Sequence, residues 1–129
     1  MATRDRRFPI RGRILADGSE HEPLNEQDIL DAIEVLKQQD VQAVAISFVW
    51  SIRNTEHEQR AKELIEQHMP GVFVCCGSEV YPQIKEYTRT STTLVNAYFI
   101  SSISVIRREK LQAQARNSHC YVLCHAVAV

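Results

Sequence analysis

Glycine is scarce in this sequence, and its placement excludes the commonest phosphate-binding loops. The 129 residues contain four glycines. None lies in a GxGxxG or GxxxxGK(S/T) pattern, in which backbone N–H groups surround phosphate oxygens. The GxSxG turn that carries a hydrolase nucleophile is also absent from the sequence. These absences disfavour an enzyme that acts alone on a nucleotide.

Net charge and long apolar runs are lacking too. The formal net charge is −1 at pH 7, so no basic field indicates binding to nucleic acid or to a membrane surface. The longest apolar runs, such as Val41–Trp50, are far shorter than the roughly 20 residues that cross a bilayer. No apolar segment follows the charged N-terminus, so no secretory signal is recognised. We expect a cytoplasmic protein with reduced cysteines.

What is present is the pattern of an α/β domain. The composition, 44% hydrophobic and 24% charged, is that of an ordinary globular chain. An Asp-Gly pair predicts a hairpin between extended arms at Arg11–Leu15 and Glu20–Leu24. Asn25 then predicts the N-cap of a helix that runs to about residue 39, with Asp28 as a weak capping-box partner.

The next segment predicts two parallel strands joined by a helix. Val41–Trp50 is almost continuously β-branched and aromatic, which is typical of a strand buried on both faces. Thr55 and Glu58 form a capping box for a helix that a Met-Pro-Gly sequence ends. His57 and Glu58 are expected to be solvated in its first turn. Val72–Cys76 is a second apolar strand and completes a βαβ unit.

The C-terminal part predicts helix followed by strand. Pro82 favours a short helix at Gln83–Tyr87, and a longer helix is expected from about Thr92. Cys120–Cys124 is a candidate last strand. The predicted fold class is therefore α/β, with a small, mostly parallel sheet, a βαβ unit and an N-terminal hairpin.

The cysteines and histidines do not predict a metal site. His119, Cys120, Cys124 and His125 are zinc-ligand types. On a strand, however, the two cysteines share one face and the two histidines the other, so the four side chains do not converge. The adjacent cysteine pair that ends the second predicted strand is interpreted as small hydrophobic side chains rather than as nucleophiles.

The most unusual segment is Ser78–Tyr98, with the sequence SEVYPQIKEYTRTSTTLVNAY. Hydroxyl and charged side chains there surround only a few apolar positions. Two interpretations carry equal weight: the side chains hydrogen-bond a partner, loop or ligand, or they form a network that satisfies itself.

This string strongly resembles the hydantoinase/5-oxoprolinase family, specifically its N-terminal domain. The match extends upstream through PLNEQDILDAIEVLKQQD to RGRILADG and covers roughly residues 7–99. Residues 100–129 diverge, because two serines stand where the family has a proline and no polar glycine turn follows. We therefore expect residues 1–129 to be a single, partial N-terminal domain of such an enzyme.

The resemblance implies an ATP-dependent enzyme that opens a cyclic amide, such as hydantoin or 5-oxoproline, or that carboxylates a ketone. Family members resemble actin-like ATPases and carry Asp-Gly-Gly-Thr phosphate motifs, which this sequence lacks. ATP and Mg²⁺ are therefore expected to bind elsewhere in the complete enzyme and not to this chain. The chain alone is expected to be catalytically inactive.

The resemblance also implies candidate site residues. Six polar side chains are expected to pack against the nucleotide-binding core or to line the substrate cleft: Glu79, Glu86, Arg89, Thr90, Thr92 and Asn96. The expected partners are the remaining domains or a partner subunit of a hydantoinase-like enzyme. The alternative is a stand-alone protein-interaction module without catalysis, which would dock through the acidic stretch 17–40 or through Ser78–Tyr98.

Overall fold

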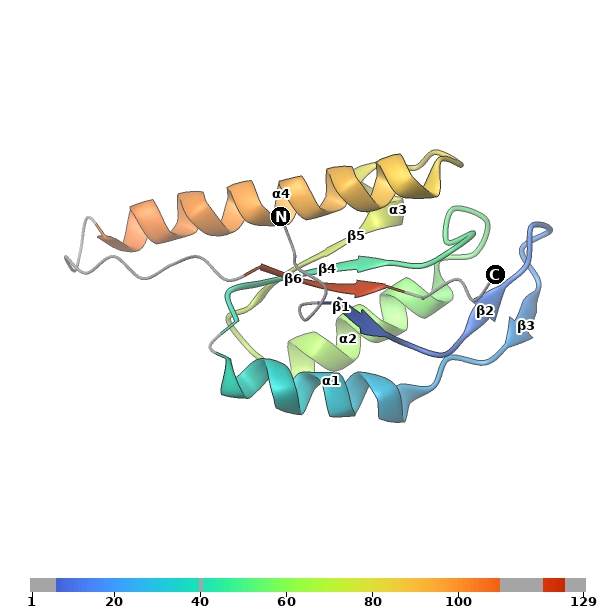
Figure 1. Ribbon diagram of the computed structural model, residues 1–129, viewed down its shortest axis with the longest axis horizontal. Helices are drawn as coiled ribbons and strands as arrows, with labels where there is room; N and C mark the ends of the chain where they lie inside the picture. Colours follow the sequence, from blue (N-terminus) through green and yellow to red (C-terminus); the bar gives the residue numbers. More distant parts are fainter. Residues whose placement is uncertain (1–6, 40, 110–119, 125–129) are drawn as a thin grey trace.

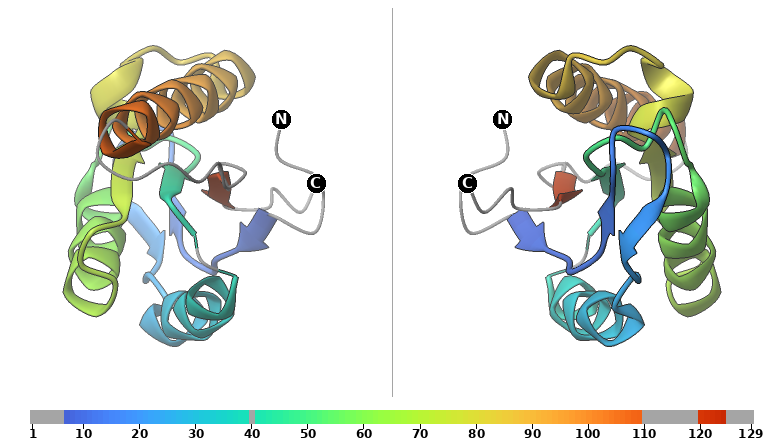
Figure 2. Two further views of the ribbon diagram at one scale, coloured as in Figure 1. Left: turned by 90° about the vertical axis from the view of Figure 1, so that its left-hand side faces the viewer. Right: turned by 90° about the vertical axis from the view of Figure 1, so that its right-hand side faces the viewer.

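The computed structural model describes residues 7–39, 41–109 and 120–124. Its strands are β1 (Arg7–Pro9), β2 (Arg13–Ile14), β3 (Glu20–Glu22), β4 (Ala43–Ser47), β5 (Phe73–Cys76) and β6 (Cys120–Cys124). Its helices are α1 (Glu26–Gln38), α2 (Glu56–His68), α3 (Gly77–Val80) and α4 (Glu86–Glu109). Figure 1 shows three layers, with a sheet between α1 and α2 on one face and α3 and α4 on the other. The end-on views of Figure 2 show the same layers.

The central sheet is parallel, with the strand order β1-β6-β4-β5. This confirms the predicted α/β class, the mostly parallel sheet, the βαβ unit of β4, α2 and β5, and the strand at Cys120–Cys124. Before the hairpin, β1 pairs with β6 and extends this sheet. Sequence reasoning did not predict that pairing, because the two strands lie at opposite ends of the chain.

Alternating side-chain size on β4 explains how the helices pack. Val44 and Ile46 belong to the larger core under α1 and α2. Ala43 and Ala45, on the opposite face, belong to a smaller core that also contains Leu94 of α4. Since successive strand residues point to opposite faces, the alanines let α4 lie close to the sheet. All five residues of β4 are buried, as the nearly continuous apolar sequence predicted.

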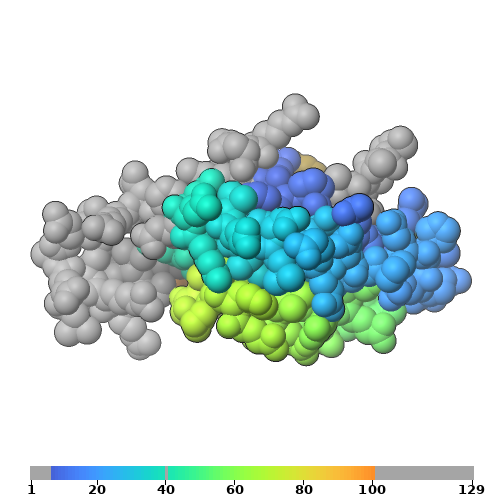
Figure 3. Space-filling view, turned by 90° about the horizontal axis from the view of Figure 1, so that it is seen from below, coloured from blue at the N-terminus to red at the C-terminus, as the bar shows by residue number. Residues whose placement is uncertain are grey.

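The N-terminal hairpin and the cap of α1 are confirmed. β2 and β3 pair antiparallel, and they form a projection at one end of the molecule, which Figure 3 shows beside α1 and α2. The Asn25 side chain caps α1 by accepting from the backbone N–H groups of Gln27 and Asp28, at 3.0 and 3.3 Å. The Asp28 side chain, however, does not close a capping box. It binds Arg11 instead, because that guanidinium offers a charged partner.

Two helix starts differ from prediction. Thr55 makes no side-chain cap bond for α2 and has helical backbone dihedrals, while Asn54 accepts from the Glu56 N–H at 2.9 Å. The expected capping-box partner of Thr55, Glu58, points into the core and accepts hydrogen bonds there. The short helix predicted at Gln83–Tyr87 is also wrong. The short helix is α3, at Gly77–Val80, and α4 already begins at Glu86, before the predicted start at Thr92.

The strand predicted at Val41–Trp50 is shorter than expected. β4 ends at Ser47, and residues 49–53 form a turn in which Trp50 adopts a left-handed conformation with φ of 57°. The zinc-ligand types at His119 and His125 lie outside the described residues. In the part of the chain that the structure describes, no helix has the length and apolarity that crossing a membrane requires.

Candidate functional site

Polar side chains gather at the carboxyl edge of the parallel sheet. Ser47 is the last residue of β4, and Ser78 follows the end of β5. Glu58 of α2 and Arg89 of α4 approach the same edge from the two helical layers, as their bonds to these strand ends show. Ligands of open parallel sheets bind at this edge, where the loops after the strands meet. It is therefore the candidate functional site of the domain.

Glu58 joins the loops after β4 and β5. Its side chain is fully buried. One carboxyl oxygen accepts from the backbone N–H of Phe48 at 3.1 Å. The other accepts from the backbone N–H of Ser78 at 3.0 Å and from the Ser78 hydroxyl. Because a buried carboxyl group needs several donors, these bonds fix the two loops relative to each other.

Arg89 supports the same loops from the opposite layer. Its guanidinium is fully buried and donates to the backbone carbonyl of Phe48 at 2.9 Å and to that of Gln83 at 2.7 Å. One bond holds the turn after β4, and the other holds the connection between α3 and α4. Arg89 therefore fixes the start of α4 relative to the sheet.

Gly77 leaves room for the Arg89 side chain. A Cβ atom at Gly77 would lie 3.2 Å from Arg89 Cγ and 3.3 Å from Arg89 Cδ. Nearby, the hydroxyl groups of Ser47 and Thr90 lie 2.7 Å apart in a hydrogen bond between β4 and α4. The site therefore depends on a small residue directly after β5.

Several buried polar atoms in this region have no hydrogen-bond partner. They include Ser51 Oγ in the turn after β4, Glu86 Oε1 at the start of α4, and Arg89 Nε. Buried polar atoms are rarely left unpaired in folded proteins. These three atoms are therefore unpaired buried groups of this region.

The six candidates from the sequence occupy three different environments. Arg89 and Thr90 contact the ends of the strands, and Glu86 carries one of the unpaired atoms. Glu79 instead forms an exposed ion pair with Lys62 of α2, at 3.1 Å. Thr92 and Asn96 are half-buried on α4. The polar segment therefore satisfies part of its own hydrogen bonds, as one of its two interpretations held.

Sequence reasoning missed the roles of Glu58 and His57. Both were expected to be solvated, but Glu58 is 0% exposed and His57 is 4% exposed. His57 Nε2 lies 3.2 Å from the Glu20 carboxylate of the hairpin. The signal was present, because both residues continue the buried stripe of Ala61 and Leu64 at helical spacing.

The cysteines of β5 lie in the interior of the domain. Cys75 and Cys76 are buried free thiols. Burial, and then the nearby Glu58 carboxyl, raise the pKa of Cys76 well above its ordinary range. Because the thiolate is the nucleophile, the hydrophobic interpretation of these residues is the appropriate one.

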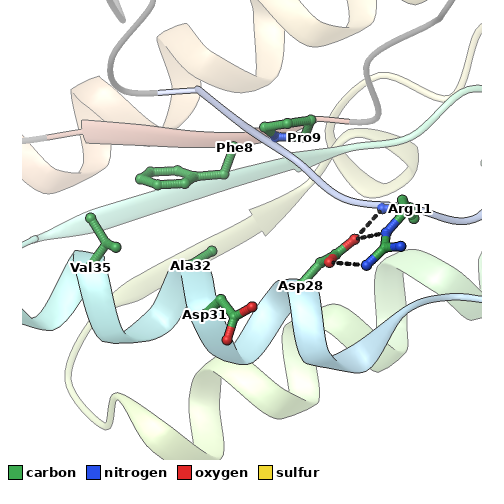
Figure 4. Close-up of a pocket in the computed structure, with 7 residues that line it drawn as sticks. All are labelled: Phe8, Pro9, Arg11, Asp28, Asp31, Ala32 and Val35. Carbon is green, nitrogen blue, oxygen red and sulfur yellow. Dashed lines mark hydrogen bonds and ion pairs between the residues drawn. The ribbon is translucent and has the colours of Figure 1, made fainter.

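A groove of about 440 Å³ lies between β1 and α1. Figure 4 shows Phe8 and Val35 toward one end and the Arg11–Asp28 ion pair at the other. Arg11 donates to Asp28 through its backbone N–H and its guanidinium, at 2.9 to 3.0 Å. These hydrogen bonds hold the pKa of Asp28 below its ordinary value. Since Asp31 also accepts a bond, from Gln27, the acidic groups of this groove serve the fold.

A clustered metal site and a glycine-rich phosphate loop are both absent from the described residues. Among them, no cluster of three or more histidine, cysteine or acidic side chains could hold a metal ion. The four glycines of the sequence are far apart and form no phosphate-binding loop. Nothing in this part of the chain therefore assigns residues to ATP or Mg²⁺.

Comparison with known proteins identifies the family. The family model for the hydantoinase/oxoprolinase N-terminal region matches residues 1–69. The chain is 60% identical over 98 residues to caprolactamase subunit alpha of Pseudomonas jessenii, which covers 76% of this chain and 14% of that protein. It is 34% identical over 108 residues to the acetophenone carboxylase gamma subunit of Aromatoleum aromaticum, covering 80% of this chain and 15% of that subunit.

The fold agrees with that assignment. The crystal structure of the ATP-dependent caprolactamase from Pseudomonas jessenii superimposes with a TM-score of 0.71 and 52% identity, over 89% of this chain and 17% of that chain. The chain therefore spans less than a fifth of the length of these relatives. The family match, the sequence identity and the shared fold together show that the chain belongs to the hydantoinase/oxoprolinase N-terminal region family.

Proposed function

We propose that this chain is part of an ATP-dependent enzyme that hydrolyses a cyclic amide. The 60% identity to a caprolactamase subunit supports this reaction over ketone carboxylation, since identity to the carboxylase subunit is 34%. The substrate class is thus a lactam, related to the hydantoin and 5-oxoproline rings that the sequence resemblance implied. In this proposal, residues 1–129 form one partial domain, with 7–99 family-like and 100–129 divergent.

In this proposal the carboxyl edge of the sheet faces the catalytic core of the complete enzyme. The position of this edge supports the orientation, because ligands of open parallel sheets bind outside the carboxyl ends of the strands. Of the sequence candidates other than Glu86 and Arg89, Thr90 lies at this edge through its hydrogen bond to Ser47, while the roles of Glu79, Thr92 and Asn96 stay predictions. Arg89 acts as a positioning residue, since it holds the loop after β4 through Phe48.

ATP and Mg²⁺ are bound by the rest of the enzyme in this proposal. The described residues supply neither a phosphate loop nor a metal-binding cluster. The chain alone should therefore release no phosphate from ATP in the presence of a lactam.

A chimeric enzyme tests the substrate class. The matching segment of the caprolactamase alpha subunit is replaced by the residues of this chain, and the subunit is assembled with its natural partners. Phosphate release is followed with caprolactam, 5-oxoproline, hydantoin or acetophenone. We expect release that depends on a lactam ring. Release that depends on acetophenone alone would refute lactam hydrolysis and favour the carboxylase reaction.

A further inference from the structure

The solvent side of α4 carries aromatic and aliphatic side chains. Residues three and four apart along α4 share this side of the helix, opposite the face that packs on the sheet. Its apolar members, with their exposed fractions, are Tyr87 (84%), Val95 (44%), Tyr98 (53%) and Phe99 (60%). The hydroxyl groups of Thr88 and Ser91 lie between them. We call this surface the α4 outer face.

The α4 outer face is uncharged. From residue 87 to residue 106 the helix sequence contains one charged residue, Arg89. That guanidinium is fully buried against the sheet. A helix that faces water normally presents charged and polar side chains on its outer side. The composition of this face is instead that of an interface core, which is rich in aromatic residues and poor in charge.

The opposite helical layer provides the comparison within the same molecule. The solvent sides of α1 and α2 are charged, and Arg60 of α2 forms ion pairs with Glu26 and Glu63 there. Figures 1 and 2 show that α4 forms the outer surface of its own layer, with no other described element over it. The outer surface of α1 and α2 is therefore charged, whereas that of α4 is uncharged and aromatic. Of the two, the α4 surface is the one whose composition resembles a protein–protein interface.

The length of the relatives indicates what covers this face. The chain matches 14% of the caprolactamase alpha subunit and 17% of the solved caprolactamase chain. Most of such a polypeptide lies outside the matched residues and must pack against this domain somewhere. Burying the uncharged aromatic face is more favourable than burying the charged outer surface of α1 and α2, because apolar surface leaves water favourably and needs no compensating charges.

We propose that the α4 outer face is the surface on which the remainder of the enzyme subunit docks, through an apolar, uncharged patch of its own. The proposal rests on the proposed function, because it takes the chain to be one segment of a longer enzyme. It assigns the docking contact to Tyr87, Val95 and Phe99. The polar candidates at the start of α4 instead bond to the domain's own strands and loops.

Side-chain oxidation by hydroxyl radicals measures this contact without any need for turnover. The chain alone is compared with the full-length chimera of the caprolactamase alpha subunit described above. Tyr87 and Phe99 should be labelled readily in the chain alone and should lose most of that labelling in the chimera. His68, exposed at the end of α2, is the matched control and should be labelled equally in both.

Three results would overturn the proposal. The first is equal labelling of Tyr87 and Phe99 in the chain and in the chimera. The second is protection in the chain alone that increases with its concentration, since a second copy would then be the occupant. The third is protection by added lipid vesicles, which would make the partner a membrane.

Substitutions supply an independent readout. The double variant Tyr87→Ser, Phe99→Ser should lower the melting temperature of the chimera and leave that of the chain alone unchanged. Gln67→Ser, at an exposed position of α2, should change neither temperature. A drop in the chain alone would contradict docking, because the rings would then stabilise the domain itself.

The two proposals fail in different ways. A chimera that protects the rings but shows no lactam-dependent phosphate release refutes the proposed function and leaves docking intact. A chimera that hydrolyses lactams with fully labelled rings refutes docking alone.

Discussion

At the scale of single residues, one buried carboxyl group organises the candidate site. Glu58 accepts hydrogen bonds from the backbone of Phe48 and Ser78, which follow neighbouring strands. Its position in the first turn of a helix suggested a solvated capping residue. Position 58 belongs both to the predicted capping pattern and to the buried stripe of α2. In the structure the side chain is buried, and its carboxyl group accepts hydrogen bonds from the loops after β4 and β5.

Replacing that carboxyl group with an amide tests the role. We predict that Glu58→Gln lowers the free energy of unfolding by about 1–3 kcal/mol, because one acceptor oxygen becomes an NH₂ group facing a buried donor. Urea unfolding measures the change. Glu66→Gln, at an exposed position of the same helix, is the control and should stay within about 0.5 kcal/mol of the unchanged chain. Equal effects of the two substitutions would contradict the account.

Thiol reactivity is a second test at this scale. Burial raises the pKa of Cys76, and Cys75 is buried beside it. We therefore predict that iodoacetamide at neutral pH does not label either thiol in the folded chain and labels both in urea. Peptide mass spectrometry separates these two sites from the other cysteines. Rapid labelling of Cys76 in the folded chain would show that it is a reactive residue.

At the scale of helices and strands, α3 and α4 meet at a close contact. A Cβ atom at Gly77 would crowd both the Arg89 side chain and the Ser47 hydroxyl, at 3.2 to 3.4 Å. Arg89 is fixed by two carbonyl groups, so it has little room to move. The sequence showed that residues 78–98 are rich in polar side chains. It did not show that position 77 must be glycine, because that constraint comes from contact with Arg89, twelve residues further along the chain.

A double-mutant cycle measures that contact. Gly77→Ala should destabilise the chain by about 1–3 kcal/mol through crowding. In an Arg89→Ala background the same substitution should cost much less, because the crowded atoms are gone. Denaturant unfolding of the four proteins gives the coupling energy. Purely additive effects would show that Gly77 and Arg89 do not interact.

The ion pair that links the start of the chain to α1 predicts a pH dependence. Hydrogen bonds from Arg11 lower the pKa of Asp28 from its ordinary value of 3.8. The unfolded state therefore binds the proton more readily, so this stabilisation is present above about pH 4 and is lost as pH falls through the lower, folded pKa. Asp28→Asn should remove that part of the pH dependence. Unfolding curves between about pH 6 and about pH 3 measure it, and unchanged slopes would exclude the effect.

The elements themselves were largely predictable. Asn25 and the Met-Pro-Gly sequence marked real helix ends, and the apolar run after residue 40 marked β4, because caps, helix stops and buried strands have local signals. The pairing of β1 with β6 had none, since it joins the two ends of the chain. The start of α4 was missed, and one of the contacts that hold it, the hydrogen bond from Arg89 to the Phe48 carbonyl, joins residues 41 positions apart.

At the scale of the whole molecule, the two helical layers have different outer surfaces. Charged residues cover α1 and α2, whereas exposed aromatic rings cover α4. The proposal that the rest of an enzyme subunit covers the α4 outer face rests on this difference between the two surfaces. In the proposed function, the family match and the identity to caprolactamase indicate that this cover is the remainder of a lactam-hydrolysing subunit.

The most direct test is a side-by-side measurement of phosphate release from Mg-ATP with caprolactam. It compares the chain alone with the assembled caprolactamase whose alpha subunit carries this chain's residues in place of its own. The account predicts no release above background from the chain and lactam-dependent release from the assembled chimera. Release by the chain alone, or a well-folded and assembled chimera without lactam-dependent release, would contradict it.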